Sequence, residues 1–374
     1  MKRMIWLCLI VLVSGCVNQK PLEELGLVTA IGYDKENGLL KGSIVYYEFD
    51  PLHPNNTKMV TSLANTSKGI RQKENLSSSR RLVSGQLRVA VYGRELAEEG
   101  IISIIDTLSR DAEVGTMSYL AVSSIPAHEL MTYSQNSKDV TNAGTYLYNL
   151  IGQNVKAESL ISPTLHEFLQ CYYSEGRDPV LPLLNFKEDT IVIEGLSLFQ
   201  DDMVVGEMDT ESAFYLKLLL EPYDAGNVEV SLPKEQVSEY ILSKNNKEAD
   251  TVHVSLDHLR SKTDIKLLEI EKPTFTIYSK VMTRMQEITE DYDLGNPEAL
   301  KKMEDSISLE MERQLKGMIE SFIEVGADPV GFGNYYRAKV GYDSFNKEEW
   351  RNLYQNMEVA IDIDVEILRT GVMD

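Results

Sequence analysis

Residue types that could act in catalysis or bind a metal are scattered along this chain of 374 residues rather than grouped. His253 and His258 lie five positions apart, so on a strand they would point to opposite faces, and no cysteine cluster accompanies them. The pair therefore predicts no metal site. The other histidines stand alone and are expected to be surface or core residues: His53, His128 and His166.

Motifs for nucleophilic or phosphate chemistry are incomplete. Two Ser-x-x-Lys matches, which end at Lys234 and Lys347, lack the Ser-Asp-Asn and Lys-Thr-Gly motifs that would make them catalytic. Gly331 and Gly333 lack the third glycine of a dinucleotide-binding loop. The sequence thus predicts no catalytic residue, no ligand-binding residue that we can name, no cofactor and a protein that is not an enzyme.

One cysteine has a context that predicts covalent modification. Two basic residues, 2–3, precede nine apolar residues, 5–13, a run too short to span a bilayer but suited to a signal peptide. Ser14-Gly15 then leads directly into Cys16. This order resembles the lipobox of bacterial lipoproteins. We therefore expect a signal peptide over residues 1–15 and lipid attachment at Cys16, as S-diacylglycerol cysteine and N-acyl cysteine. An ordinary signal peptide beside a chance cysteine is the alternative.

The charge of the chain limits its partners. There are 37 basic and 58 acidic residues, a net charge of −21, which argues against nucleic acid and against electrostatic attachment to an anionic membrane. Removal of residues 1–15 would leave 35 basic and 58 acidic residues, a net charge of −23. We therefore expect acyl chains alone to hold the mature protein at a membrane. Of the three cysteines, Cys8 would leave with the signal peptide, and Cys171 lies in an apolar context typical of a buried residue.

The patterns of apolar residues predict three mixed α/β domains. For a first domain, 16–188, they indicate strands and helices in alternation: strands over 27–33, 42–49, 86–92 and 118–125, one helix over 95–110, and short helices over 127–133 and 164–173. A small middle domain, 189–260, is predicted to contain a hairpin of residues 190–199 and 203–208, a helix over 211–220, and extended runs near 228–232 and 252–256.

The C-terminal domain, 261–374, has the clearest pattern. Asn296 and Pro297 are typical of a helix start, apolar residues then recur every three or four positions, and Gly326 is a typical helix stop. One or two strands are expected around Pro273. The last segment alternates apolar and acidic residues over 359–367, which predicts a half-buried strand with its acids in water. The fold class is therefore α+β.

Several of these stretches together resemble the Ger(x)C family, the C-subunit lipoproteins of bacterial spore germination receptors. Residues 17–20 replace the Trp-Asp-Arg-Arg-like start that is usual in the family. The matching segments span most of the mature chain in the family's order: residues 25–34, 94–101, 108–111, 162–168, 179–182, 194–199 and 328–333, then Trp350 and residues 368–371.

The resemblance implies a non-enzymatic subunit of a nutrient germinant receptor that is required for spore germination. It implies two integral-membrane partner subunits, an A-type and a transporter-like B-type, and a lipid-anchored place on the outer face of the cell membrane, here the spore inner membrane. The family fold of three mixed domains agrees with the expected boundaries. The alternative function is a substrate-binding lipoprotein of an importer, a class that would show two similar lobes, and this sequence shows no such halves.

Overall fold

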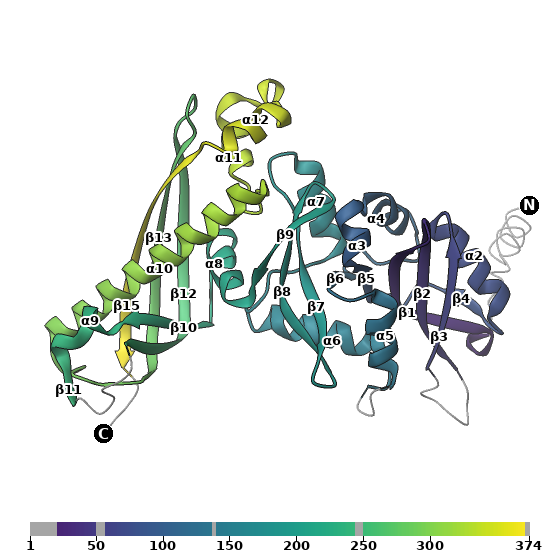
Figure 1. The fold of residues 1–374 in the computed structure, drawn as a ribbon, viewed down its shortest axis with the longest axis horizontal. Helices are drawn as coiled ribbons and strands as arrows, with labels where there is room; N and C mark the ends of the chain where they lie inside the picture. Colours follow the sequence, from purple (N-terminus) through teal and green to yellow (C-terminus); the bar gives the residue numbers. More distant parts are fainter. Residues whose placement is uncertain (1–20, 50–56, 137–139, 244–249, 371–374) are drawn as a thin grey trace, which may run out of the picture.

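The structure is a computed structural model that describes residues 21–49, 57–136, 140–243 and 250–370. Its two main β-sheets lie side by side along the long axis of the molecule (Figure 1). The mixed α+β fold class is confirmed. None of the helices in the described ranges is long and apolar enough to cross a membrane.

The first sheet has nine strands in the order β3-β2-β1-β5-β6-β7-β8-β9, and β4 pairs with β1. Strands β1, β5, β6 and β7 are parallel neighbours, whereas β2–β3 and β8–β9 extend the sheet in antiparallel fashion. The strands are β1 Leu25–Glu36, β2 Leu39–Glu48, β3 Thr57–Ala64, β4 Arg81–Val83, β5 Val89–Gly93, β6 Tyr119–Ser123, β7 Val180–Lys187, β8 Thr190–Gln200 and β9 Met203–Asp209.

Helices cover both faces of this sheet, as parallel strands require. In β5, Ala90 and Tyr92 belong to one apolar core, and Val89 and Val91 to another on the opposite face. Strand β5 is therefore apolar on both faces, and a continuous apolar run of this length is typical of a buried strand. The helices are α2 Ser67–Ser77, α3 Arg94–Glu99, α4 Ile102–Ser109, α5 Ala127–Asn136, α6 Ala143–Lys156 and α7 Leu165–Ser174, and a short 3-10 helix, η1 Leu22–Glu24, precedes β1.

The single helix expected over 95–110 is wrong. The chain forms α3 and α4, and Gly100 between them has a φ of +111°, which is outside the helical region. The backbone amide of Ile101 donates instead to the carbonyl of Asp202, 3.1 Å away in the β8–β9 turn. A tertiary hydrogen bond therefore breaks a helix that the apolar spacing alone would continue.

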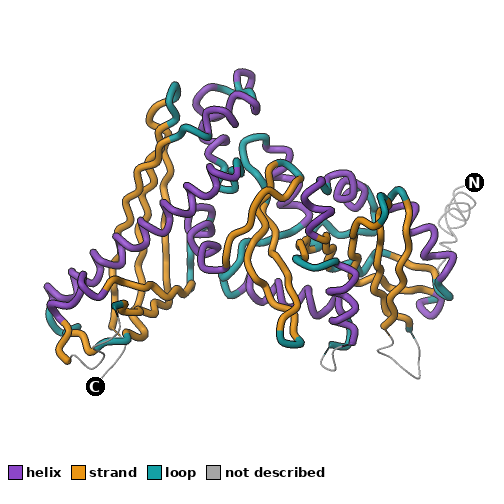
Figure 2. Tube along the Cα trace, viewed as in Figure 1, coloured by secondary structure: helices purple, strands orange, loops and turns teal. Residues whose placement is uncertain are grey.

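The second sheet has the order β10-β12-β13-β15, and β11 pairs with β14. Figure 2 shows its long strands beside one long helix. Helix α8 contacts strands of both sheets. The strands are β10 Gly226–Pro233, β11 Ile241–Ser243, β12 Thr251–Glu269, β13 Thr274–Ile288, β14 Asp291–Tyr292 and β15 Glu358–Thr370. The helices are α8 Thr210–Leu220, α9 Lys234–Val237, η2 Ser238–Tyr240, α10 Pro297–Val325, α11 Phe332–Val340, η3 Tyr342–Ser344 and α12 Lys347–Tyr354.

The long helix and the terminal strand are confirmed. Helix α10 begins after Asn296, whose side chain accepts a hydrogen bond from the Glu298 amide, and ends at Gly326, whose φ is +74°. Its apolar side chains belong to the largest core of the protein, together with those of the second sheet. Strand β15 buries Ile363 and Val365, whereas Asp362 and Glu366 are exposed and Asp364 is half-buried.

The chain expected to form the middle domain contributes to both sheets. The predicted hairpin is present as β8 and β9, which extend the first sheet, whereas β10 and β12 belong to the second. The boundary expected at residue 188 falls in the turn between β7 and β8. The division into domains 16–188, 189–260 and 261–374 remains a prediction.

Candidate functional site

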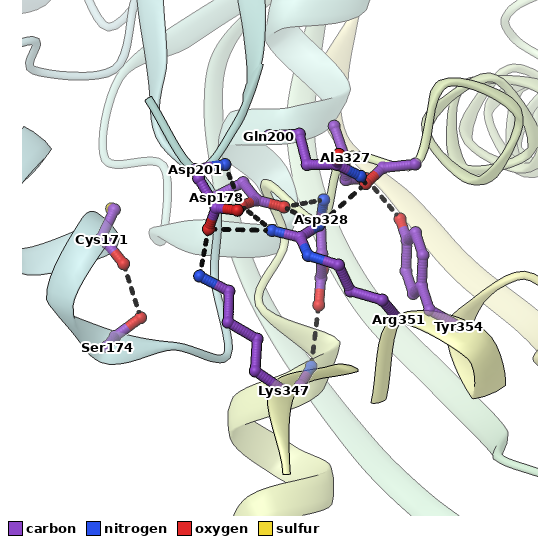
Figure 3. Close-up of polar contacts among 12 residues, drawn as sticks. Cys171, Ser174, Asp178, Gln200, Asp201, Ala327, Asp328, Lys347, Arg351 and Tyr354 are labelled. Atoms are coloured by element: carbon purple, nitrogen blue, oxygen red, sulfur yellow. Dashed lines mark hydrogen bonds and ion pairs between the residues drawn. The ribbon is translucent and has the colours of Figure 1, made fainter. Parts of the chain in front are cut away.

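A cluster of charged side chains lies where the two sheets meet (Figure 3). Asp178 precedes β7 and Asp201 forms the β8–β9 turn, so both come from the first sheet. Asp328 follows α10, and Lys347 and Arg351 belong to α12, so these three come from the C-terminal part of the chain. We call these five residues the junction cluster.

Asp178 is the centre of the junction cluster. Its side chain is only 6% exposed, yet its carboxylate accepts hydrogen bonds from Arg351 at 2.9 and 3.2 Å. It also accepts from the backbone amides of Asp201, at 3.0 Å, and Asp328, at 2.8 Å. A buried carboxylate is tolerated only with such partners. Asp178 therefore joins the β8–β9 turn, the chain after α10 and helix α12 at one point.

Arg351 and Lys347 connect the cluster to neighbouring backbone. Arg351 also donates to Asp201, at 3.2 Å, and to the carbonyl of Gly326, at 3.1 Å, where α10 ends. Gln200 donates to the same carbonyl at 2.8 Å, and Lys347 pairs with Asp201. Burial acts to raise the pKa of Asp201, but the two cations hold that pKa below its ordinary value. A hydrogen bond from Gln200 thus joins the end of α10 to the first sheet, and ion pairs join α12 to the same sheet.

Asp328 fixes the start of α11. Its Oδ1 accepts from the amides of Gly331, at 2.8 Å, and Phe332, at 3.0 Å, and its Oδ2 accepts from Gly333 at 2.8 Å. Burial raises the pKa of Asp328 to about 7, and the neighbouring Asp178 adds to this rise. Three backbone amides therefore bind a carboxyl group whose burial disfavours its ionised form.

Glycines let the two parts of the chain approach closely beside the junction cluster. A Cβ atom on Gly333 would lie 2.6 Å from the indole nitrogen of Trp350 and 2.9 Å from Gly176. The amide of Asn334 donates to the carbonyl of Gly176 at 3.1 Å, and the Arg177 side chain donates to the carbonyl of Pro329 at 3.0 Å. Backbone therefore packs directly on backbone, which explains why glycines occupy positions 176 and 333.

A second polar site lies at the carboxyl ends of β1, β5 and β6. A pocket of about 300 Å³ there is lined by residues that include Asp34, Gly93, Arg94 and Ser124. The Asp34 carboxylate accepts from the first amides of α5, Ala127 at 2.7 Å and His128 at 2.8 Å. The chain's own carboxylate thus occupies the place where a helix N-terminus would bind an external anion.

The residues singled out in the sequence do not come together. Cys16 lies outside the described residues. His253 contacts Ser231, and His258 lies beside Asp257, and among the described ranges no group of His, Cys, Asp and Glu side chains could hold a metal ion. Cys171 is half-buried, and burial raises the pKa of its thiol. Of the two Ser-x-x-Lys lysines, Lys234 pairs with Glu290 at 2.5 Å and Lys347 belongs to the junction cluster.

The sequence alone did not identify the junction cluster. Asp178 and Arg351 are 173 positions apart, and neither stands in a chemical motif. The one sequence pattern that falls in the cluster is residues 328–333, where an aspartate precedes two glycines by three and five positions. Chemically, every charge of the cluster faces a charge or backbone donor of the same chain. The arrangement is suited to holding two parts of a protein in one orientation.

Comparisons with known proteins match both parts of the chain. A model of the spore germination protein N-terminal domain matches residues 18–186, and a model described as spore germination B3/GerAC like, C-terminal, matches residues 194–371. Spore germination protein GerQC of Bacillus cereus is 26% identical over all of both chains. Spore germination protein KC of Bacillus subtilis is 22% identical over 97% of this chain and 94% of its own. The crystal structure of the GerBC protein covers 90% of this chain and 96% of its own, with a TM-score of 0.57 and 16% identity.

Proposed function

The chain belongs to the spore germination protein family of germinant-receptor C subunits, and we propose that it acts there without catalysis, as a docking subunit on two integral-membrane subunits. One partner would be of A-type and the other of the transporter-like B-type. The observation that carries this proposal is that the two family models together cover residues 18–186 and 194–371, and so include both sides of the junction cluster.

The junction cluster supports a role in transmitting force or position. Its buried charges connect the first sheet to α10 and α12, so a displacement of one sheet would be passed to the other instead of being lost in a flexible linker. The side chains in it are satisfied within the chain, which leaves no free nucleophile or base for a reaction. A rigid coupling element fits a receptor subunit that works through contacts.

Lipid attachment at Cys16 would place this body beside its partners on the outer face of the membrane. Cys16 precedes the first described residue, Pro21, by five positions, so the tether reaches at most about 17 Å. Two or three acyl chains would hold it stably. Confinement next to a membrane partner raises the effective concentration, so that a weak contact is nevertheless occupied.

The test is the substitution Cys16→Ala in a spore-forming host that carries the chain. We expect the protein to leave the spore membrane fraction and the germination response to nutrients to be lost, while an immunoblot follows its total amount. Full germination in spores that lack this protein altogether would overturn the proposal. Binding of a small nutrient to the purified chain at physiological concentration would contradict a pure docking role.

A further inference from the structure

Helix α10 covers part of the outer edge of β15 with a row of acceptors. The backbone amides of Ile363, Val365 and Ile367 donate to side chains four positions apart on the helix. The acceptors are Glu312 at 2.9 Å, Ser308 at 3.2 Å and Glu304 at 2.8 Å. Four helical residues rise about 6 Å and two strand residues about 6.6 Å, so each helical acceptor meets one edge amide.

The row of acceptors ends where Lys316 takes the next position on the helix. An ammonium group only donates hydrogen bonds and cannot accept one from the amide of Ile361. The amide of Glu358 donates to Pro273 beside β13, so even-numbered residues of β15 face β13 and odd-numbered residues face outward. The amides of Val359 and Ile361 therefore face outward, and no acceptor for either lies in the part of the chain that the structure describes.

A groove follows this open edge between α10 and β15. Its volume is about 330 Å³. Five apolar and three charged residues line it: Ile319, Ile323, Met357, Val359 and Ile361, with Lys316, Glu320 and Glu358. The lysine is 66% exposed and lies 4.0 Å from Glu320, whereas Glu358 pairs with Lys272. The groove thus combines unpaired strand backbone with an apolar lining and two exposed carboxylates, each of which has a lysine nearby.

We propose that an extended segment of a partner protein adds to the edge of β15 in this groove, through hydrogen bonds to the backbone of Val359 and Ile361. The inference rests on the proposed function, because it names a surface by which the chain would dock. The segment alternates apolar residues, which face Ile319 and Ile323, with polar residues that include a basic one near Glu320 and Glu358.

An extended segment fits better than the other possible occupants. A helix uses its own backbone donors and acceptors, so it would leave the edge of β15 unpaired. A second copy of this chain would offer only the same short open edge, because α10 covers β15 beyond Ile361. Strand addition pairs the open backbone amides and covers the apolar lining residues at the same time.

The test uses the full chain in spores, with the photo-crosslinking residue benzoylphenylalanine in place of Glu324, which is exposed on α10 beside Ile323. Two variants at Lys316 are compared in this background. Lys316→Glu continues the row of acceptors, so its carboxylate would bind the Ile361 amide and close the edge. Lys316→Ala removes the same positive charge but provides no acceptor. Lys316→Glu also adds a negative charge, which would favour a segment with a basic residue, so a lower yield in that variant reports closure of the edge and not the change in charge.

We expect Lys316→Ala to keep the crosslink to a separate polypeptide, and Lys316→Glu to lower its yield about tenfold. The crosslinked peptide should have alternating apolar residues. A yield that is unchanged in Lys316→Glu, a crosslink to a second copy of this chain, or a crosslink to lipid alone would overturn the inference. None of these results bears on Cys16→Ala, so failure of the groove and failure of the receptor role are distinguishable.

A second pair of variants checks the backbone directly. Ile361→Pro removes the outward amide without removing a hydrogen bond to β13, and Ile361→Val keeps that amide with a side chain of similar shape. The crosslink should be lost in the first and kept in the second, while the thermal unfolding of both purified chains stays cooperative. Equal crosslinking in the two variants would overturn the inference.

Discussion

Arg351 donates to the carboxylate of Asp178 at 2.9 Å, although the two residues are 173 positions apart in the sequence. The contact joins helix α12 to the chain that enters β7, and Asp178 also accepts from backbone amides of Asp201 and Asp328. Removal of the Arg351 guanidinium would therefore leave the buried Asp178 carboxylate without a counter-charge at the point where these segments meet. This contact is the point at which we expect the fold to be most sensitive to single substitutions.

The substitution Arg351→Ala should lower the free energy of unfolding by about 3–5 kcal/mol, because it leaves the buried Asp178 carboxylate without its cation. Chemical denaturation of the purified chain measures this change. The matched control is Arg110→Ala, which removes an exposed pair with Asp106 and should leave the stability nearly unchanged. Equal effects of the two substitutions would show that the junction cluster does not hold the sheets together.

The substitution Gly333→Ala should destabilise the protein by about 1–3 kcal/mol, because its Cβ would lie 2.6 Å from Trp350 and 2.9 Å from the backbone of Gly176. The matched control is Gly317→Ala within α10, where a Cβ meets nothing within 4 Å. That change should stabilise the helix by about 0.5–1 kcal/mol. Thermal unfolding of both variants should therefore shift in opposite directions, and a shift in the same direction would contradict the close packing at Gly333.

The substitution Asp34→Ala should destabilise the start of α5 by about 1–2 kcal/mol, because two amides would lose the carboxylate that accepts from them. Hydrogen exchange of the α5 amides should become faster. Asp209→Ala is the control, since Asp209 accepts from Ser212 at the start of α8, and its loss should affect α8 instead. Unchanged exchange in α5 after Asp34→Ala would mean that this carboxylate does not stabilise the helix.

Glu74 predicts a pH dependence of stability. It is 1% exposed, and burial raises its pKa to about 9, with Arg71 and Ser62 nearby offsetting part of that rise. The folded chain therefore keeps a proton that the unfolded chain releases near its ordinary pKa of 4.5. Stability should fall as pH rises between these two values, by up to about 1.4 kcal/mol per pH unit.

The comparison of Glu74→Gln with the unsubstituted chain isolates this effect. The raised pKa of Asp328, about 7, contributes a decline of the same sign in both proteins below that pH, so the informative interval is pH 7 to 9. Denaturation at several values across that interval should show a flatter profile for Glu74→Gln. Parallel profiles would mean that Glu74 does not carry the proton.

Local patterns predicted most of the second sheet and little of the junction. Helix α10 is predictable because its cap residues and its apolar spacing are both encoded within its own sequence, and β15 because it alternates strictly. The helix over 95–110 was wrong because a hydrogen bond from Ile101 to the distant Asp202 decides where it breaks. The partners of Asp178 and Arg351 follow from how the sheets meet, which no short stretch of sequence contains.

The separation of the junction residues has a consequence for the order in which the protein matures. At about 5–20 residues per second, the ribosome makes Arg351 roughly eight to thirty seconds after Asp201, which precedes it by 150 positions. Through that interval Asp178 and Asp201 have no counter-charge, so the first sheet cannot complete the surface that meets the second. A chain interrupted before α12 would keep these aspartates unpaired, and any partner that recognises the finished junction would thereby distinguish whole molecules from fragments.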